Sequence, residues 1–261
     1  MSLRVKAFTL HFTASACVIG ATLGSLYLGW YRWPGWYLTG SLTVTAILVG
    51  VDLTLGPLFT LLIANPSKPR RELTRDLAVI VTVQLIAFVY GVTTLWLGRP
   101  LYYVFWVNQL KVVSASEVPA AEVVLMRRQN PQLAPHWYSS PRWVWAPPPF
   151  SVPNWLQPSE TLTVPLRPAD DTLTAILNGS SAPRDFRPLS QAGAQLRAHL
   201  RKVDEMSILS SQEKRIVKQR MAERGLPADA SDALPLSGHG RPLVAVFDRT
   251  NLTLSALIRV N

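Results

Sequence analysis

Cysteine, acidic side chains and charge in general are scarce in this chain of 261 residues. A single cysteine, Cys17, cannot form an internal disulfide, which excludes a disulfide-stabilised scaffold. Charged side chains make up 16% of the residues, whereas soluble domains average roughly 25%. Hydrophobic side chains make up 48%, which excludes an intrinsically disordered chain and a collagen.

The scarcity of charge is confined to the first part of the chain. Residues 1–98 hold ten charged side chains, whereas residues 99–261 hold thirty-two. The first part contains three apolar runs, each near the roughly 20 residues that cross a bilayer core, at about 8–29, 40–64 and 77–97. We therefore predict a three-helix transmembrane domain over residues 1–98, followed by a water-exposed domain over residues 99–261.

The lysines and arginines of the first part indicate its orientation. Two of them precede the first run, four lie between residues 65 and 76, and the loop after the first run has only Arg32. Short cytoplasmic loops are enriched in these residues, so the N-terminus and the second loop should face the cytoplasm. Three crossings then place residues 99–261 outside. We expect a protein of a bacterial inner membrane with a periplasmic C-terminal domain.

The exported half opens with strand and loop patterns. Alternating apolar side chains over Leu101–Val113 predict a strand that leaves the membrane. Residues 131–188 hold twelve of the 21 prolines and four of the nine tryptophans, which predicts a loop-rich segment with short strands near 141–146 and 161–166. We expect these tryptophans to pack under the loops rather than to form a ligand-stacking surface.

Helix and hairpin patterns follow. Apolar residues at three-and-four spacing over 189–203 predict one helix. Ser210 and Glu213 form the pattern of a capping box that starts a second helix, and Gly225 marks its end. Apolar runs near 243–247 and 252–260 predict a closing hairpin. The exported part is therefore predicted as a small α+β domain with a mainly antiparallel sheet.

Motifs for catalysis or for ligand binding are missing from the sequence. A phosphate-binding glycine loop, a nucleophile elbow and paired metal ligands are all absent, and the four histidines are scattered. Asp170 and Asp171 are adjacent, so in a strand or a helix their side chains point apart and make a poor acid–base pair. We expect no enzyme, no cofactor and no metal site.

Asp52 is the sharpest feature, because it lies near the middle of the second apolar run. A charge at bilayer depth costs at least about 2.5–3.5 kcal/mol, which makes such a residue a functional candidate. Counted from the cytoplasmic ends of their helices, Asp52 and Gln84 approach one another in depth. Pro57, after Gly56, removes a backbone donor and is expected to free the Leu53 carbonyl, so a kink would widen the site.

The roles of these residues have alternatives. Asp52 serves either as a structural lock within the bundle or as a contact for a partner helix, and His11 is a more distant candidate for the same site. Ala16, Gly20 and Gly24 repeat every four residues, a spacing that lets helices approach closely. This stripe packs either against the other two spans or against the helix of another membrane protein.

A family resemblance is carried by short segments of the second and third apolar runs and of the strand that follows them. These segments, in order, are Gly50–Leu58, Asn65-Pro66, Asp76–Ile80, Gln84-Leu85, Tyr90-Gly91, Arg99-Pro100 and Tyr103–Phe105, with weaker agreement at Leu234–Leu236 and the final hairpin. In these segments the chain resembles the type IV pilin accessory proteins of the TfpX/TfpZ kind. It departs from them at Trp106 and Asn108, where acidic residues are usual, and after Val260, where an acidic-Pro-Trp tail is usual.

The resemblance implies a non-enzymatic, chaperone-like accessory protein that binds the major type IV pilin and modulates its stability, assembly or retraction. Pilin subunits wait in the inner membrane as one apolar helix with a periplasmic head, so such a partner needs both a membrane part and an exported part. The expected partners are the pilin and the lipid bilayer, without nucleic acid; the oligomeric state stays open. The alternative is a membrane-anchored periplasmic sensor or a structural subunit of another envelope complex.

Overall fold

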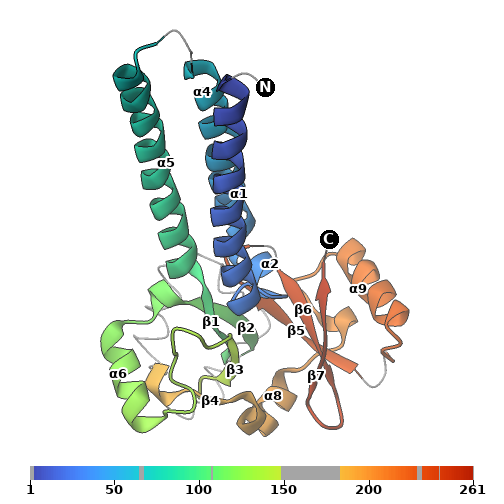
Figure 1. The fold of residues 1–261 in the computed structure, drawn as a ribbon. Coiled ribbons are helices and arrows are strands. Elements are labelled where there is room, and N and C mark those ends of the chain that lie inside the picture. Colours follow the sequence, from blue (N-terminus) through green and yellow to red (C-terminus); the bar gives the residue numbers. More distant parts are fainter. Residues whose placement is uncertain are drawn as a thin grey trace. The chain divides into compact units, whose positions relative to one another are not determined.

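The computed structural model describes residues 3–64, 68–106, 108–147, 183–227, 231–240 and 242–260. These residues form two compact units, whose elements are drawn in Figure 1. One unit comprises Met1–Trp36 and Gly40–Arg99, and the other comprises Tyr37–Thr39 and Pro100–Asn261. Three residues of the first loop therefore belong to the second unit.

The first unit consists of apolar helices. Three of them are long and apolar enough to cross a membrane: Arg4–Gly29, Ser41–Ile63 and Arg70–Gly98. Many of their large apolar side chains face outward, as lipid-facing side chains do. These findings indicate membrane association. The elements are α1 (Leu3–Gly29), α2 (Gly35–Thr39), α3 (Ser41–Val49), the π-helix η1 (Gly50–Leu55), α4 (Gly56–Ile63) and α5 (Arg70–Gly98).

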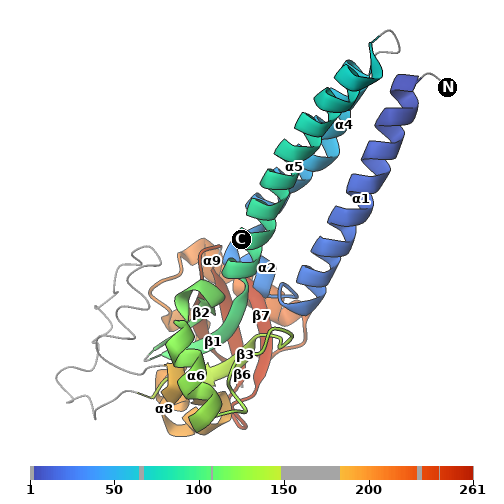
Figure 2. The ribbon, with the colours of Figure 1, turned by 60° about the vertical axis from the view of Figure 1, so that its left-hand side comes forward.

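The second span is the centre of this unit. Its α4 segment packs against α1, and its α3 and α4 segments both pack against α5. Figure 2 shows α4 beside α5, and contacts between the two helices agree with this view. Contact between α1 and α5 is sparse by comparison. The second span therefore contacts both of the other long helices.

The second unit contains a seven-stranded sheet in the order β4-β3-β1-β2-β5-β6-β7. The sheet is mixed: β1 pairs with β3, and β2 with β5, in parallel, while the other four pairs are antiparallel. The prediction of a mainly antiparallel sheet is wrong in this respect. The strands are β1 (Pro100–Trp106), β2 (Gln109–Ser114), β3 (Arg142–Trp145), β4 (Arg187–Pro188), β5 (Ser231–Ser237), β6 (Leu243–Asp248) and β7 (Leu254–Arg259).

The parallel pairs have a topological cause. A parallel neighbour requires a long crossover, and the connection from β2 to β5 contains most of the helices of this unit. These helices are α6 (Ala120–Gln129), α8 (Gly193–His199) and α9 (Ser211–Glu223), with 3₁₀ turns at Ala115–Glu117 (η2), Pro183–Asp185 (η3), Leu189–Ala192 (η4) and Val203–Glu205 (η5). Local patterns in the sequence carry no signal for a pairing between segments so far apart.

Several local expectations can be compared with the structure directly. The alternating run Leu101–Val113 is a hairpin of two strands, β1 and β2, rather than one strand. The helical pattern over 189–203 is divided among η4, α8 and η5. Strand β3 lies at the first short strand expected in the Pro/Trp-rich segment 131–188. The expected strand at 161–166 and the Asp170-Asp171 pair lie outside the described residues.

Helix α9 begins and ends as its sequence indicates. The Ser210 hydroxyl oxygen accepts a hydrogen bond from the Glu213 backbone N–H at 3.3 Å, and the Glu213 carboxylate accepts one from the Ser210 N–H at 2.7 Å. Gly225 follows with φ of 67°, a left-handed conformation that favours glycine. The capping-box prediction is confirmed, because all of its interactions are local in sequence.

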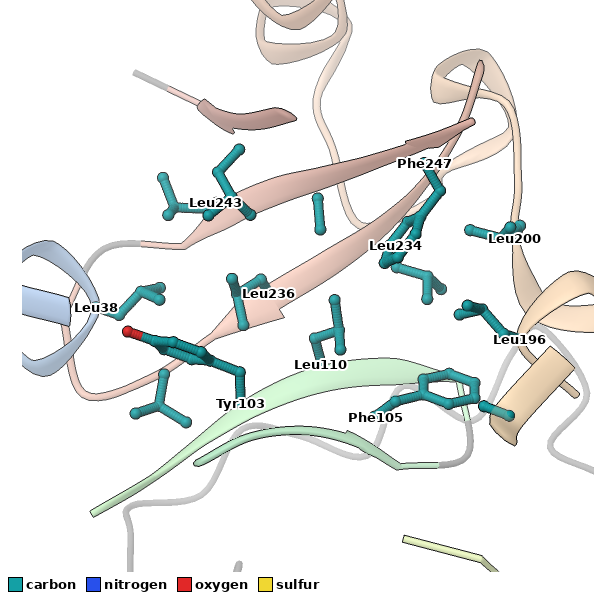
Figure 3. Packing of buried hydrophobic residues seen from close by; sticks show 14 residues of the cluster. Leu38, Tyr103, Phe105, Leu110, Leu196, Leu200, Leu234, Leu236, Leu243 and Phe247 are labelled. Carbon is teal, nitrogen blue, oxygen red and sulfur yellow. The ribbon is translucent and has the colours of Figure 1, made fainter. Parts of the chain in front are cut away.

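Both faces of the sheet are covered by apolar side chains. Tyr103 and Phe105 of β1 enter one core cluster, which Figure 3 shows together with Leu196 of α8. The alternate residue Val104 faces the opposite side, in the cluster that contains Met126 of α6. The other end of that second face packs against α9, which lies at the β7 end of the sheet in Figure 1. Burial on both faces explains the continuous apolar run in β6.

Leu38 of the first loop lies in the same core cluster as Tyr103, and its side chain is 0% exposed. Its carbonyl oxygen accepts a hydrogen bond from the Gly240 N–H at 2.5 Å. A Cβ atom on Gly238 would lie 2.5 Å from the same oxygen, so only glycine permits this approach without a backbone shift. The loop between the first two spans therefore supplies part of the core of the second unit.

Candidate functional site

Asp52 and Gln84 lie together in the interior of the first unit. Asp52 is 4% exposed and Gln84 is 8% exposed, although both are polar. The Gln84 side-chain Nε2 donates a hydrogen bond to the backbone carbonyl oxygen of Asp52 at 3.2 Å. The structure thus brings together two of the residues that the sequence singled out, one on η1 and one on α5.

The π-helix explains why this carbonyl is free to bond with Gln84. In a π-helix each carbonyl accepts from the N–H five residues later, as the Gly56 N–H donates to the Val51 carbonyl. The residue five positions after Asp52 is Pro57, which has no N–H. With α-helical spacing, Pro57 would instead free the carbonyl of Leu53, as predicted from the sequence. Gln84 donates its hydrogen bond to the carbonyl of Asp52, one residue before Leu53.

Gly56 makes the approach of Gln84 possible. A Cβ atom at position 56 would overlap the side-chain amide of Gln84, at its nitrogen, carbon and oxygen atoms alike. Gly56 and Pro57 are both buried. Gly56 and Pro57 therefore have different effects. Gly56 leaves space for the Gln84 side chain, and Pro57, which lacks an N–H, leaves the Asp52 carbonyl free to accept a hydrogen bond from it.

Two buried acceptor atoms remain at this site. Asp52 Oδ2 and Gln84 Oε1 are inaccessible to solvent and have no hydrogen-bond partner among the described residues. Leaving such atoms unpaired at bilayer depth is costly. A hydrogen-bond donor satisfies them, either a proton on the Asp52 carboxyl group or an N–H or O–H group of another helix. The structural lock needs no change in this arrangement, whereas the partner contact requires the helices to separate enough for a partner's donor to reach these inaccessible atoms.

His11 takes part in a neighbouring polar contact rather than in this pair. Its Nδ1 lies 2.6 Å from the Thr60 Oγ1, and that hydroxyl lies 3.1 Å from the Gly56 carbonyl oxygen. Thr60 is 3% exposed, and the contact joins α1 to α4. Sequence reasoning missed Thr60. Its four-residue spacing from Gly56 is the only signal that pointed to it.

Gly20 and Gly24 of α1 make no close approach to the described parts of the other helices. A Cβ atom added at Gly20 or at Gly24 would meet no heavy atom within 4 Å. Ala16 is partly exposed, as is Gly24, while Gly20 is exposed. Of the two alternatives for this stripe, packing against the other two spans is not found at these glycines. Contact with a helix of another protein stays a prediction.

Aromatic side chains connect the C-terminal end of α1 with the C-terminal end of α5. The Tyr31 hydroxyl donates a hydrogen bond to the Leu95 carbonyl at 2.6 Å. The Arg99 guanidinium lies 3.8 Å from the centre of the Trp96 ring and also donates to the Trp96 carbonyl. Burial lowers the pKa of Arg99. Such aromatic and basic side chains are typical of a membrane–water interface.

The second unit contains ionisable groups whose pKa values are shifted by burial. Burial raises the pKa of Glu117 and lowers that of Lys111. Shifted groups often mark active sites, but the Glu117 carboxylate accepts the Ser114 N–H and caps η2, which is a structural role. Within the described ranges, no three His, Cys, Asp or Glu side chains gather in a way that could hold a metal ion.

The chain is similar to curated fimbrial assembly proteins of Dichelobacter nodosus. It is 32% identical over 113 residues to the proteins of serogroups I and E1, an alignment that covers 43% of this chain and 44% of each relative. It is 30% identical over 113 residues to the protein of serogroups C1 and C2, which covers 86% of that relative. The chain thus spans less than half the length of the first two relatives. No family model and no solved structure matches it.

Proposed function

Because this chain belongs to the family of fimbrial assembly proteins represented in D. nodosus, we propose that it is a non-enzymatic accessory protein of type IV pilus assembly. In this proposal it binds the major pilin subunit and, like a chaperone, modulates the stability, assembly or retraction of that subunit. Membership of the family supports a role in pilus assembly. The pilin as partner and the absence of catalysis are our proposals.

The observation that carries the pilin proposal is the pair of unsatisfied acceptors at Asp52 and Gln84. A polar group in the middle of a span is costly and is retained for a reason. A membrane-inserted pilin subunit presents an apolar helix, and a donor on that helix would satisfy both acceptors. The family relationship and this site therefore support the same kind of partner, a helix inside the bilayer.

We further propose that the N-terminus and the loop between α4 and α5 face the cytoplasm and that the second unit lies in the periplasm. The support is the excess of lysine and arginine in the first two regions. In a Cys17→Ser background, a cysteine at Trp137 should react with a membrane-impermeant maleimide once the outer membrane is permeabilised, whereas a cysteine at Arg71 should not. Reaction at Arg71 and protection at Trp137 would reverse the proposed orientation.

Site-directed photo-crosslinking in intact cells tests the pilin proposal. The photoreactive residue is placed at Leu55, which is 45% exposed and three residues from Asp52, and separately at Trp137, which is 72% exposed in the second unit. Captured proteins are identified by mass spectrometry. We expect pilin from Leu55, because Asp52, one of the two acceptors, lies in the same helical segment, and a pilin adduct from Trp137 if the exported surface also takes part.

The control for this experiment is the same probe in an Asp52→Asn protein of equal abundance. Asparagine keeps the size of the side chain but replaces one acceptor oxygen with a donor, so we expect the Leu55 adduct with pilin to fall. If neither position captures pilin from a well-expressed protein, the pilin proposal is refuted. Capture of another envelope protein instead would favour the sensor or structural-subunit alternative.

A further inference from the structure

The second unit contains a polar cavity that the proposed function does not use. Its volume is about 600 Å³, within the range of small-ligand pockets. It lies among the end of α8, the turn η5, the start of β5 and the turn after β6. Its lining residues are Arg197, Leu200, Arg201, Lys202, Glu205, Asp232 and Arg249.

One wall of the cavity is held by main-chain hydrogen bonds. The Arg201 N–H donates to the Ala233 carbonyl at 3.2 Å, and the Ala233 N–H donates to the Arg201 carbonyl at 2.7 Å. This bridge ties the loop after α8 to strand β5. The Arg201 guanidinium turns back and donates to the Ala198 and Leu200 carbonyls at the end of α8. Arg201 is therefore mainly a structural part of the wall.

A second wall is held by an ion pair. Asp232 is 6% exposed, and its Oδ2 lies 3.1 Å from the Arg249 Nε. The carboxylate of Asp232 is thus neutralised within the protein, and it fixes the position of the Arg249 side chain. Arg249 itself is exposed, so donors of its guanidinium remain open to the cavity. The buried acid orients a cation without cancelling its ability to bind a further anion.

Two cations of the lining have no partner of their own. The side chains of Arg197 and Lys202 are exposed and make no hydrogen bond or ion pair with any of the described residues. The lining as a whole carries four basic and two acidic side chains. The cavity therefore has an excess of positive charge, and part of that charge is available to a ligand.

We propose that this cavity binds a carboxylate-bearing segment of a partner polypeptide. Arginine and lysine together are suited to a carboxylate, which accepts hydrogen bonds from both. Asp232 is already paired with Arg249, so the exposed side chains of Arg197 and Lys202 are the cations that a ligand carboxylate would meet. Leu200 adds an apolar contact that a peptide can use. The site does not depend on the identity of the membrane-embedded partner and goes beyond the pilin contact proposed above.

Fluorescence anisotropy on the full-length protein in uncharged detergent micelles tests the proposal. The probe is a fluorescein-labelled peptide, Gly-Glu-Gly-Glu-Gly, with blocked ends, and its matched control has glutamine in place of both glutamates. We expect the glutamate peptide to bind and the glutamine peptide not to bind. The double substitution Arg197→Gln and Lys202→Gln should weaken binding about tenfold or more, since each charge-assisted hydrogen bond contributes roughly a factor of ten.

A charge-matched control uses Arg128→Gln with Arg215→Gln, two exposed cations of the same unit that lie outside the cavity lining. This variant has the same change in net charge and should bind the peptide within about twofold of the parent, the scatter expected of distant surface changes. Equal loss in both double variants would overturn the proposal, because attraction would then be non-specific. Displacement of the peptide by inorganic phosphate at an equal concentration would also overturn it.

Discussion

Replacement of Gly56 with valine should destabilise the membrane unit by about 3 kcal/mol or more. The new side chain would overlap the amide of Gln84, and forcing extra atoms into a packed site costs roughly 1–3 kcal/mol. Displacing Gln84 would also leave the Asp52 carbonyl without a donor, at about 1–3 kcal/mol for a buried group. Unfolding of the purified protein in detergent, followed by tryptophan fluorescence during titration with SDS, measures the loss.

Gly20→Val is the matched control for this substitution. It makes the same change of residue type within an apolar helix, but an added Cβ at position 20 meets nothing within 4 Å. The double variant Gly56→Val with Gln84→Ala removes the overlap and should recover part of the lost stability. A Gly56→Val protein as stable as Gly20→Val would show that Gln84 does not lie against Gly56, and the proposed geometry of the acceptor pair would be abandoned.

The second large effect is expected from Leu38→Ala, which should destabilise the second unit by about 2–5 kcal/mol. Leu38 is fully buried in a core cluster with residues of β5 and β6, although it precedes the first strand by two entire membrane spans. Truncation removes apolar contacts and leaves a cavity that the surrounding strands fill only in part. Hydrogen–deuterium exchange measured on β5 and β6 peptides reports the loss of protection directly.

Leu42→Ala serves as the control, since Leu42 lies a few residues away and is 51% exposed. It should leave exchange in β5 and β6 unchanged. If Leu38→Ala and Leu42→Ala give the same exchange rates in these strands, Leu38 is not part of the core of the second unit. The second unit would then begin after the third long helix, at Pro100, and would not include Tyr37–Thr39.

The candidate site was partly predictable from the sequence. Asp52 was identified by its place in an apolar run, and Gln84 by counting residues from the helix ends, because depth in a bilayer follows residue number along a helix. The role of Gly56 was not predictable, since it depends on the rotation of α5 that brings Gln84 against it. The π-helix also escaped prediction, because its spacing differs from the α-helical spacing that local patterns assume.

Local interactions explain what the sequence alone determined about this protein: three apolar helices, and the start of α9 at Ser210, whose capping box joins residues three apart. Tertiary structure decided the rest. The parallel pairing of β2 with β5, the place of Leu38 in the core of the second unit and the cavity beside Asp232 all join segments separated by long stretches of chain. Such contacts depend on how distant buried surfaces fit together. The local periodicity of the sequence does not indicate which surfaces will meet.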